Sequence, residues 1–339
     1  MNNEIEIIRG YKILYVEDTH LIASKGYRLY MYDFKSKKWE KYARVNDKLN
    51  SLLARMPLSE RFFRAEITKI YMLNDNSKIC IARKGLFKKN SDSKYFEKVL
   101  CIPRGTRPMN LCIDENYIYF GEYFANMDKS EVNIYVSKDY GESWNIAYTF
   151  KSGEINHIHG LFKDPYTGNI WFVTGDRENE CIIGYTDNHF KTTKEIFRGG
   201  QEYRACILLF YKSHIAFATD SQYIKNTIKV FTRNSLKLEI VNYVQSSVIR
   251  GGQLGNFSYL STATELSDIN TEKLSHLWVS YDGLAWRDAF AQKKDCMPPI
   301  FQFATFEFPV YNLQSNMCNL YFYGRGLCKM NRVSFKYKI

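Results

Sequence analysis

Short runs rich in Tyr, Ile, Val and Phe recur along the whole chain and are separated by Asn, Asp, Gly and Lys. β-Branched and aromatic residues favour strands, and the polar residues between the runs favour hairpin turns. The runs group into units of about 40–50 residues, the size of a four-stranded propeller blade. These units span residues 11–44, 67–103, 109–150, 156–198, 203–244, 247–295 and 301–339. The pattern predicts an all-β protein, a single β-propeller of about seven four-stranded blades, with six blades as the alternative.

One segment, residues 47–64, breaks the strand pattern. Its apolar residues recur at helical spacing instead of alternating. They are Leu49, Leu52, Leu53 and Met56. Pro57 would interrupt a continuous helix, because proline lacks the backbone N–H that a helix interior requires. We therefore expect a helical excursion between the first two blades.

The two ends of the chain are expected to meet. Propellers commonly close when one terminus completes the blade that the other terminus begins. The run 4–9 could pair beside residues 332–338 in this way. No linker rich in Pro, Gly or Ser divides the chain, so a single domain over residues 1–339 is predicted.

A turn motif lies inside the third unit. Ser137, Asp139, Gly141 and Trp144 fit the pattern S-x-D-x-G-x-x-W at every defined position. The serine and aspartate side chains can accept backbone N–H bonds across a tight hairpin. Glycine adopts a backbone conformation that other residues resist, and tryptophan can pack back on its own blade. The motif predicts a stabilised hairpin between two strands of a blade.

Two degenerate copies of the motif lie at corresponding places in other units. Residues 280–286 contain Ser280, Asp282, Gly283 and Trp286, with one residue fewer before the tryptophan. Residues 186–192 begin Thr-Asp-Asn and lack both the glycine and the tryptophan. Three such hairpins at blade-like spacing support the propeller.

On these motifs the sequence resembles the Asp-box, or bacterial neuraminidase repeat, propellers, which include sialidases, other glycosidases and sialidase-like proteins. The resemblance covers the whole chain as architecture, but only the boxes match specifically. In that group the boxes are structural and lie on the face away from the active site, so the resemblance implies the fold more than the chemistry. The chain also resembles a branch of such propellers found with bacterial surface-polysaccharide genes, in residues 104–108, 121–124, 157–160 and 174–176.

The charge balance is compatible with a polyanionic partner, and the repeats favour a polysaccharide. Lys and Arg total 47 against 36 Asp and Glu, and the excess is spread along the chain. Such an excess fits either an ordinary solvated surface or the attraction of a polyanion. No nucleic-acid-binding motif is present, so an anionic poly- or oligosaccharide is the expected partner and nucleic acid is not.

The apolar runs and the cysteines indicate the compartment. No run approaches the ~18 apolar residues needed to span a bilayer, and residues 1–6 do not open a secretory signal. The cytoplasm is therefore expected, with non-classical export left open. The eight cysteines form no C-x-x-C pair and are expected to be reduced core thiols. They are Cys80, Cys101, Cys112, Cys181, Cys206, Cys296, Cys318 and Cys328.

Two histidines are the first candidates for chemistry. The innermost strand of each blade lines the central channel, so polar residues in or beside these strands are the ones to inspect. His157 and His159 lie two residues apart, so both side chains project from one face of a strand. They could act as base and charge stabiliser, or bind a divalent metal, although no cofactor is required.

Further candidates stand at strand ends. Asp176 follows a Gly, and Glu180 precedes the next strand. Arg107 directly precedes Pro108; sialidases carry Arg-x-Pro upstream of the first box, and its arginine grips the substrate carboxylate. Here no residue intervenes, so the spacing departs from that signature. A guanidinium beside a rigid proline can nevertheless bind a carboxylate through two hydrogen bonds.

Two Tyr-containing pairs complete the set. Glu122 and Tyr123 end a strand of the third unit. Gln201, Tyr203 and Arg204 open the fifth unit. Neighbouring residues of a strand point to opposite sides, so only one of Tyr203 and Arg204 can face the channel, and Arg204 is favoured. The remaining strand-end polar candidates are Asp220, Asn226 and Glu265.

These residue types favour a polysaccharide lyase that cleaves a uronate-containing glycan by β-elimination. That reaction needs a His or Tyr base and an Arg or metal that stabilises the developing charge. A sialidase-like glycoside hydrolase, using Glu122, Asp176 and Tyr203, is one alternative. A non-catalytic glycan-binding or scaffold propeller in polysaccharide assembly is the other. The sequence lacks a Walker loop, a dinucleotide fingerprint and a nucleophile elbow, which disfavours ATP, NAD and serine-hydrolase chemistry.

Overall fold

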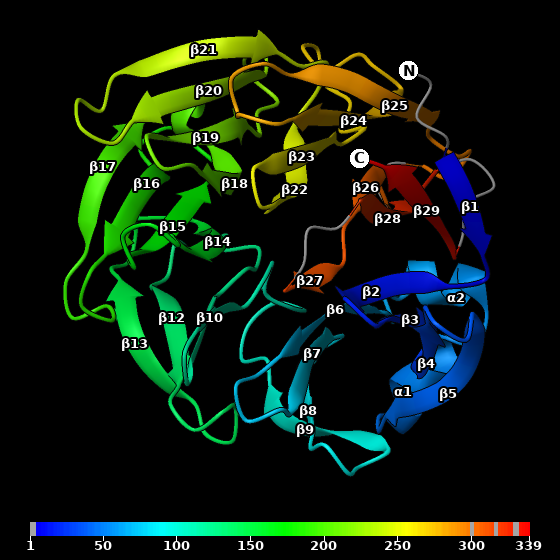
Figure 1. Cartoon of the computed structure of the whole chain (residues 1–339). Helices are drawn as coiled ribbons and strands as arrows, with labels where there is room; N and C mark the ends of the chain where they lie inside the picture. Colours follow the sequence, from blue (N-terminus) through cyan, green and yellow to red (C-terminus); the bar gives the residue numbers. More distant parts are fainter. Residues whose placement is uncertain (1–4, 299–301, 315–317, 328–331) are drawn as a thin grey trace.

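The computed structural model, which describes residues 5–298, 302–314, 318–327 and 332–339, is a ring of seven four-stranded blades (Figure 1). The prediction of an all-β propeller with about seven blades is confirmed. Each expected unit forms one blade, and residue 301, the boundary of the last unit, lies outside the described residues.

The first four blades follow the chain in order. The first contains β2 (Lys12–Glu17), β3 (His20–Lys25), β4 (Arg28–Asp33) and β5 (Lys38–Val45). The second contains β6 (Ile67–Met72), β7 (Lys78–Ala82), β8 (Gly85–Lys89) and β9 (Tyr95–Cys101). The third contains β10 (Cys112–Asp114), β11 (Tyr117–Gly121), β12 (Val132–Ser137) and β13 (Asn145–Phe150). The fourth contains β14 (His157–Lys163), β15 (Ile170–Gly175), β16 (Cys181–Thr186) and β17 (Lys194–Gly199).

The last three blades complete the ring. The fifth contains β18 (Ala205–Phe210), β19 (His214–Thr219), β20 (Thr227–Thr232) and β21 (Leu238–Tyr243), preceded by the short helix η1 (Gln201–Tyr203). The sixth contains β22 (Val248–Leu254), β23 (Phe257–Thr262), β24 (Leu274–Ser280) and β25 (Arg287–Lys293). The seventh contains β26 (Thr305–Glu307), β28 (Asn319–Arg325), β29 (Val333–Lys338) and β1 (Ile5–Arg9).

The N-terminal strand closes the ring. β1 pairs antiparallel with β29, from Ile5 opposite Tyr337 to Arg9 opposite Val333. This confirms the expected pairing of the two ends, although residue 4 lies outside the described residues. The short strand β27 (Val310–Asn312) pairs parallel with β2 and adds a second contact between the last and first blades.

The innermost strand comes first in every blade, which defines two faces of the ring. We call the face where the innermost strands begin the start face, and the opposite one the end face. Because the strands of a blade are antiparallel, the loops after the second strands also lie on the start face.

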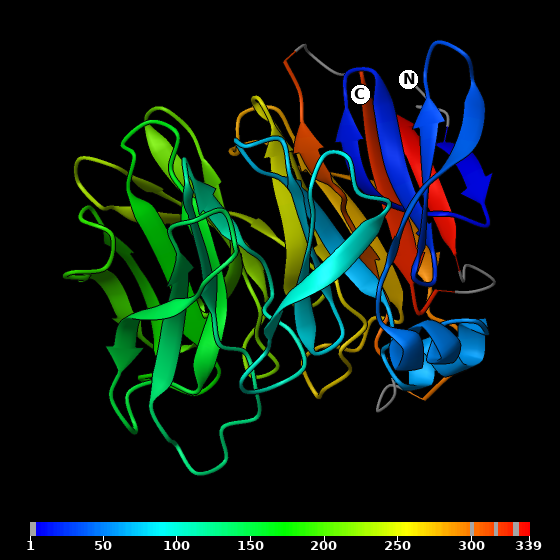
Figure 2. The same ribbon diagram turned by 90° about the horizontal axis from the view of Figure 1, so that it is seen from below.

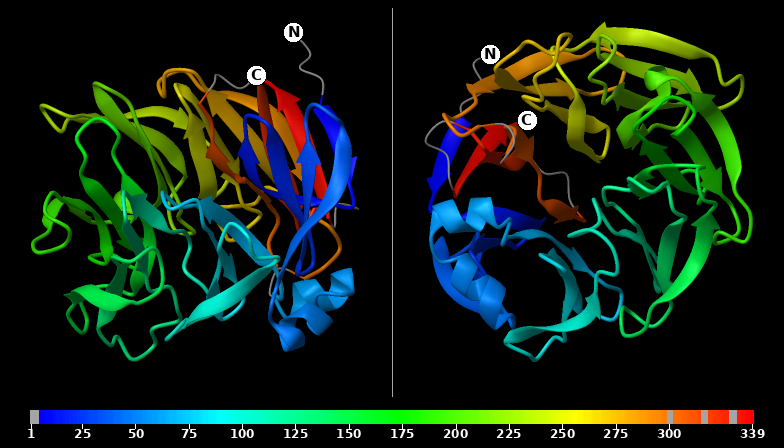
Figure 3. Two further views of the ribbon diagram at one scale, coloured as in Figure 1. Left: turned by 60° about the horizontal axis from the view of Figure 1, so that its bottom comes forward. Right: turned by 180° about the vertical axis from the view of Figure 1, so that it is seen from behind.

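The expected helical excursion forms two helices, α1 (Lys48–Leu53) and α2 (Pro57–Phe62). They connect β5 to β6, so they lie on the start face, beside the ring in Figure 2 and in front of it in the right panel of Figure 3. The Asp47 side chain caps α1 by accepting a hydrogen bond from the Asn50 backbone N–H at 3.0 Å. Pro57 occupies the first turn of α2, where its missing N–H costs nothing. None of the described helices is long and apolar enough to cross a membrane.

The core lies between the blades. Seven apolar clusters of described residues each join two neighbouring blades; Phe150 of the third blade, for example, contacts Phe172 of the fourth at a ring distance of 5.5 Å. Cys80, Cys112, Cys181 and Cys206 are buried as expected, and all seven described cysteines are unpaired. The prediction of core thiols is wrong for the other three described cysteines, which are exposed, and Cys328 lies outside the described residues. The exposed thiols are Cys101, Cys296 and Cys318.

The first box hairpin joins β12 to β13 and forms the expected hydrogen bonds. The Ser137 hydroxyl accepts the Gly141 N–H at 2.8 Å, and the Asp139 carboxylate accepts the Ser143 N–H at 2.9 Å. The Trp144 indole donates to the Gly141 carbonyl at 3.1 Å. Gly141 has a φ of 90°, which only glycine adopts readily. The hairpin thereby satisfies its own polar groups.

The second hairpin, between β24 and β25, repeats this arrangement despite its missing residue. The Ser280 hydroxyl accepts the Gly283 N–H at 2.9 Å, and Asp282 accepts the Ala285 N–H at 2.9 Å. The Trp286 indole donates to the Gly283 carbonyl at 2.9 Å. Both hairpins connect third to fourth strands, so they lie on the end face.

The third hairpin, between β16 and β17, keeps the arrangement with different residues. The acceptor is the side chain of Asn188, which receives the Thr192 N–H at 3.0 Å, whereas Asp187 pairs with Lys194. Phe190 stands where the first box has glycine and has a φ of 65°. Its ring is buried between the third and fourth blades, which compensates for the strained backbone.

Asp139→Ala is expected to lower the free energy of unfolding by about 1–2 kcal/mol, because the Ser143 N–H would lose its acceptor. Urea denaturation measures this, and Lys138→Ala, which alters the neighbouring exposed residue of the same turn, is the matched control. Equal stability of the two variants would contradict the role given to the carboxylate.

Candidate functional site

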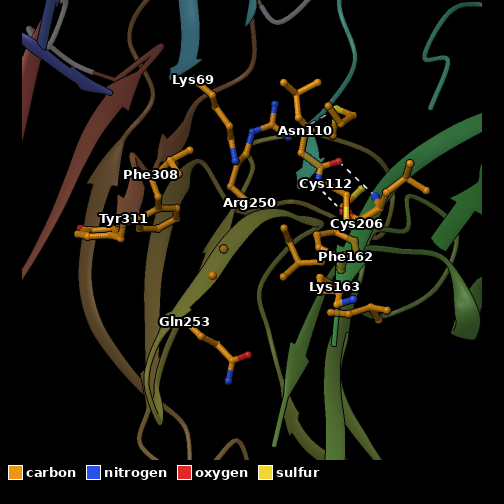
Figure 4. A pocket seen from close by; sticks show the side chains of 18 of the residues that line it. Lys69, Asn110, Cys112, Phe162, Lys163, Cys206, Arg250, Gln253, Phe308 and Tyr311 are labelled. Atoms are coloured by element: carbon orange, nitrogen blue, oxygen red, sulfur yellow. Dashed lines mark hydrogen bonds between the residues drawn. The ribbon is translucent and has the colours of Figure 1, made fainter. Parts of the chain in front are cut away.

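The channel at the axis of the ring contains two connected cavities. An inner cavity of about 160 Å³ lies toward the start face, and an end-face cavity of about 340 Å³ continues it toward the opposite face (Figure 4). A depression of about 710 Å³ on the start face shares Arg64, Thr106, Tyr123 and Asp176 with the inner cavity. An extended ligand could therefore lie in the depression while one of its groups enters the inner cavity.

His157 and His159 meet at the mouth of the inner cavity. Both are buried residues at the start of β14, and their Nε2 atoms lie 3.0 Å apart. His157 Nδ1 lies 3.1 Å from the Phe124 carbonyl, and His159 Nδ1 lies 2.9 Å from the Ala205 carbonyl. A carbonyl can only accept, so each Nδ1 carries a proton, and each Nε2 presents a lone pair when its ring is neutral.

Asp176, directly after β15, brings a carboxylate to the same point. Its Oδ1 lies 3.2 Å from His159 Nε2, and its Oδ2 lies 3.4 Å from His157 Nε2. Burial alone would raise the pKa of Asp176, but the hydrogen bonds and positive charge that the two imidazoles supply when their Nε2 atoms carry protons outweigh burial and hold that pKa well below its ordinary value. The Asn156 side chain donates to Oδ2 at 2.9 Å, which fixes the carboxylate.

These three side chains could hold one divalent metal ion. Donor atoms that share an ion at about 2.0–2.2 Å lie roughly 3 to 3.5 Å apart, which matches the separations of His157, His159 and Asp176. Backbone carbonyls orient both rings, as outer partners do for most metal-ligating histidines. Two imidazoles and one carboxylate suit a first-row transition ion better than calcium or magnesium.

Tyr123 lies against this group. Its ring is 4.3 Å from that of His157 and 6.3 Å from that of His159. The side chain lines both the inner cavity and the depression. Among the residues that the structure describes, none forms a hydrogen bond with its hydroxyl. The hydroxyl is therefore available to a ligand.

Arg204 closes the far side of the acidic group. It lies just before β18 and lines the inner cavity, whereas Tyr203 stacks on Phe197 at 5.2 Å and stays outside it. The guanidinium contacts Asp176 at 2.9 Å and Asp220 at 3.5 Å. Both contacts occupy the Arg204 charge, so it orients carboxylates more than it offers itself to a ligand.

Glu265 also lines the inner cavity. Burial and the nearby Asp220 raise the pKa of Glu265, while Arg204 lowers it. The wall formed by Asp176, Asp220 and Glu265 thus holds three carboxyl groups around one arginine. We call this wall, together with the two histidines, the acidic pole.

Several predicted residues support the site without lining it. Gln201 donates to the Asp176 backbone carbonyl at 2.7 Å, and Glu180 accepts the Arg177 N–H at 3.2 Å. Glu122 is buried and its carboxylate is occupied by Arg104. Asn226 accepts hydrogen bonds inside the loop after β19 and takes no part in either cavity. The structure brings together His157, His159, Asp176, Tyr123 and Arg204.

Arg107 reaches the inner cavity, but its charge is already paired. It contacts Glu66 at 3.1 Å, and Lys12 and Arg325 contact the same carboxylate at 2.6 and 2.9 Å. Glu307 is shared in the same way by Arg250 and Arg325, at 2.7 and 3.2 Å. We call this charged group, together with Lys69, the basic pole.

Sequence reasoning missed the other members of the basic pole. They are Lys12, Glu66, Lys69, Arg250, Glu307 and Arg325. The signal that could have found them is a charged residue inside or at the end of an innermost strand, such as Lys69 in β6 or Arg250 in β22. Glu66 instead precedes β6, and Arg325 ends β28, the second strand of its blade, so no single local motif marks the group.

Comparison with known proteins identifies the fold alone. No family model matches the chain, and no curated protein matches it. Among solved structures, the WD40 β-propeller domain of Doa1 aligns with a TM-score of 0.60 at 9% identity, covering 99% of this chain and 96% of that one. YCF48 bound to D1 peptide aligns at 0.59 and 12%, covering 99% and 97%. A chain of a mitotic checkpoint complex aligns at 0.59 and 10%, covering 100% and 92%.

Proposed function

We propose that this propeller cleaves a uronate-containing glycan by β-elimination, with a divalent ion held by His157, His159 and Asp176. The observation that carries the proposal is the meeting of two imidazole lone pairs and a carboxylate beside the unoccupied Tyr123 hydroxyl, at one cavity mouth. The three box hairpins on the opposite face support membership in the Asp-box group, where the active site lies away from the boxes.

The ion would bind the uronate carboxylate and neutralise the negative charge that spreads onto it when the neighbouring proton leaves. Tyr123 is the proton-transfer group. Burial raises the pKa of Tyr123, so the positive charge of the ion would be needed beside it to favour the phenolate. The phenolate oxygen takes the proton from C5, the C5–H electrons form the C4–C5 double bond, and the C4–O bond breaks. The proton then passes from Tyr123 to the departing oxygen, so no net proton is gained or lost.

The pairing of the cavity carboxylates favours elimination over hydrolysis. A glycoside hydrolase needs two carboxyl groups that are free to act on either side of the scissile bond. Asp176 and Asp220 share Arg204, and Glu307 is held by two arginines. Hydrolysis and non-catalytic binding are retained as outcomes of the test.

The test uses purified protein with a panel of uronate polysaccharides, after chelation and after addition of Mn²⁺ or Zn²⁺. We expect ion-dependent ultraviolet absorbance from the conjugated product, with an equal number of new reducing ends. His157→Asn should abolish both signals, whereas His20→Asn, which alters a histidine far from the cavities, should change neither. Reducing ends without absorbance would identify a hydrolase, and the absence of both would leave glycan binding.

A further inference from the structure

Lys69 and Arg250 face one another where the two cavities of the channel meet. Both residues line the inner cavity and also the end-face cavity, so they stand at the junction of the two. Figure 4 shows the two side chains pointing toward each other from β6 and β22. Like charges repel one another, and an anion between them would offset that repulsion. We call this junction the neck.

The Lys69 ammonium has no hydrogen-bond or ion-pair partner within the described part of the chain. Burial and the neighbouring Arg250 together lower the pKa of Lys69 to about 8, against the opposing effect of Glu307. The side chain is partly exposed to the two cavities that it lines, so its ammonium group is open to a ligand. An anion in the cavities would therefore supply the acceptor that the described residues do not.

Glu307 cannot serve as that anion. Its carboxylate is held by Arg250 at 2.7 Å and by Arg325 at 3.2 Å. These arginines hold the pKa of Glu307 at about 2, although burial by itself would raise it. The carboxylate is thus already shared between two guanidinium groups.

Glu66, the other carboxylate of the basic pole, is equally committed. It is shared by Lys12, Arg107 and Arg325. The basic pole consequently holds five cationic side chains around two carboxylates. Arg107 resembles the arginine of sialidases that binds the substrate carboxylate. Here its charge is neutralised by Glu66, so it is not free to bind an anion at the neck. Lys69 therefore lacks a carboxylate partner among the described residues, and Arg250, which holds Glu307 through its Nε atom, stands beside it.

We propose that the neck binds an oxyanion, a carboxylate or a sulfate group, between Lys69 and Arg250. This site is separate from the ion at the acidic pole, so one ligand can use both. The identity of the ligand rests on the proposed function. If the substrate is the proposed glycan, its sugars carry a second anionic substituent that reaches the neck. The substrate class is then a polyuronate or a sulfated uronate, not a glycan with a single acidic sugar.

The binding test needs neither substrate nor metal. Inorganic sulfate and, in a second arm, acetate are titrated into the chelated full-length protein at pH 7 and followed by calorimetry and by the rise in melting temperature. We expect binding in one arm or both, and Lys69→Met should weaken it at least tenfold. Lys163→Met is the matched control, because Lys163 lines the end-face cavity but is paired with Asp114 at 2.6 Å. The stronger arm distinguishes a sulfate from a carboxylate.

The same titration repeated between pH 7 and pH 9 checks the charge that holds the anion. Lys69 loses its proton as the pH passes about 8, so affinity should fall across this window. The groups that face Lys69 are Arg250 from β22 and Glu307 from β26, and both keep their charge throughout.

Absence of binding by both anions at pH 7, or equal binding by Lys69→Met and the wild-type protein, would overturn the inference. Arg250→Lys, which keeps the charge but not the geometry, gives a second variant that should bind more weakly. Anion binding without elimination would overturn only the proposed reaction, and elimination without anion binding would overturn only the neck.

Discussion

Tyr123→Phe is expected to lower the rate of β-elimination by about 10²–10⁴-fold, the usual contribution of a positioned proton-transfer group. The change removes one oxygen and keeps the ring that packs on His157 and His159. The hydroxyl forms no hydrogen bond with the described residues, so its removal leaves no protein group unsatisfied. Stability and metal binding should therefore be unchanged while the rate falls.

The matched control for this prediction is Tyr203→Phe. Tyr203 was the other tyrosine candidate in the sequence, and it stacks on Phe197 outside the inner cavity. Steady-state rates from product absorbance, compared with melting temperature and metal stoichiometry, separate a chemical effect from a structural one. A Tyr123→Phe variant that retains full activity would remove Tyr123 from the reaction.

Glu66→Gln is expected to lower the free energy of unfolding by about 3–5 kcal/mol, the usual cost of removing one partner from a buried ion pair. Glu66 neutralises Lys12, Arg107 and Arg325 from three blades. Without the carboxylate, their buried positive charges would face one another directly. The loss should be visible in chemical denaturation at neutral pH.

The stability contributed by Glu66 is expected to depend on pH. The pKa of Glu66 is well below its ordinary value, because Arg325, Lys12 and Arg107 outweigh the effect of burial. In the unfolded chain the same carboxyl has a pKa of about 4.3. Its contribution is therefore fully present above that value and is lost as the pH falls below it, so the difference between wild type and Glu66→Gln should shrink in acid.

The control for the charge network is Glu6→Gln, which removes an exposed pair with Lys336 at 3.0 Å. Exposed pairs contribute about 0–1 kcal/mol, so this variant should be nearly as stable as wild type. Equal stability of Glu66→Gln and Glu6→Gln would show that the buried carboxylate does not hold the basic pole together.

The sequence by itself determined the architecture. Strand periodicity, turn residues and the 40–50-residue repeat are local properties, and they place seven blades, the helical excursion and the closing pair of β1 and β29 where the structure has them. The proximity of His157 and His159 was also predictable, because side chains two residues apart on a strand project from the same face. Glu122 also follows a strand and was an equally good candidate, but local periodicity cannot show that it is buried and paired with Arg104.

Only the tertiary structure decided the chemistry at the axis. Lys69, Arg250 and Arg325 lie on different blades, and each is an ordinary charged residue in its own strand. The substituted third hairpin was settled in the same way, since the burial of Phe190 between two blades compensates for a backbone that local sequence disfavours. Ring closure brings residues from every blade to one axis. The electrostatic field there depends on the distances between charges that lie far apart in the sequence, and no local stretch of sequence specifies those distances.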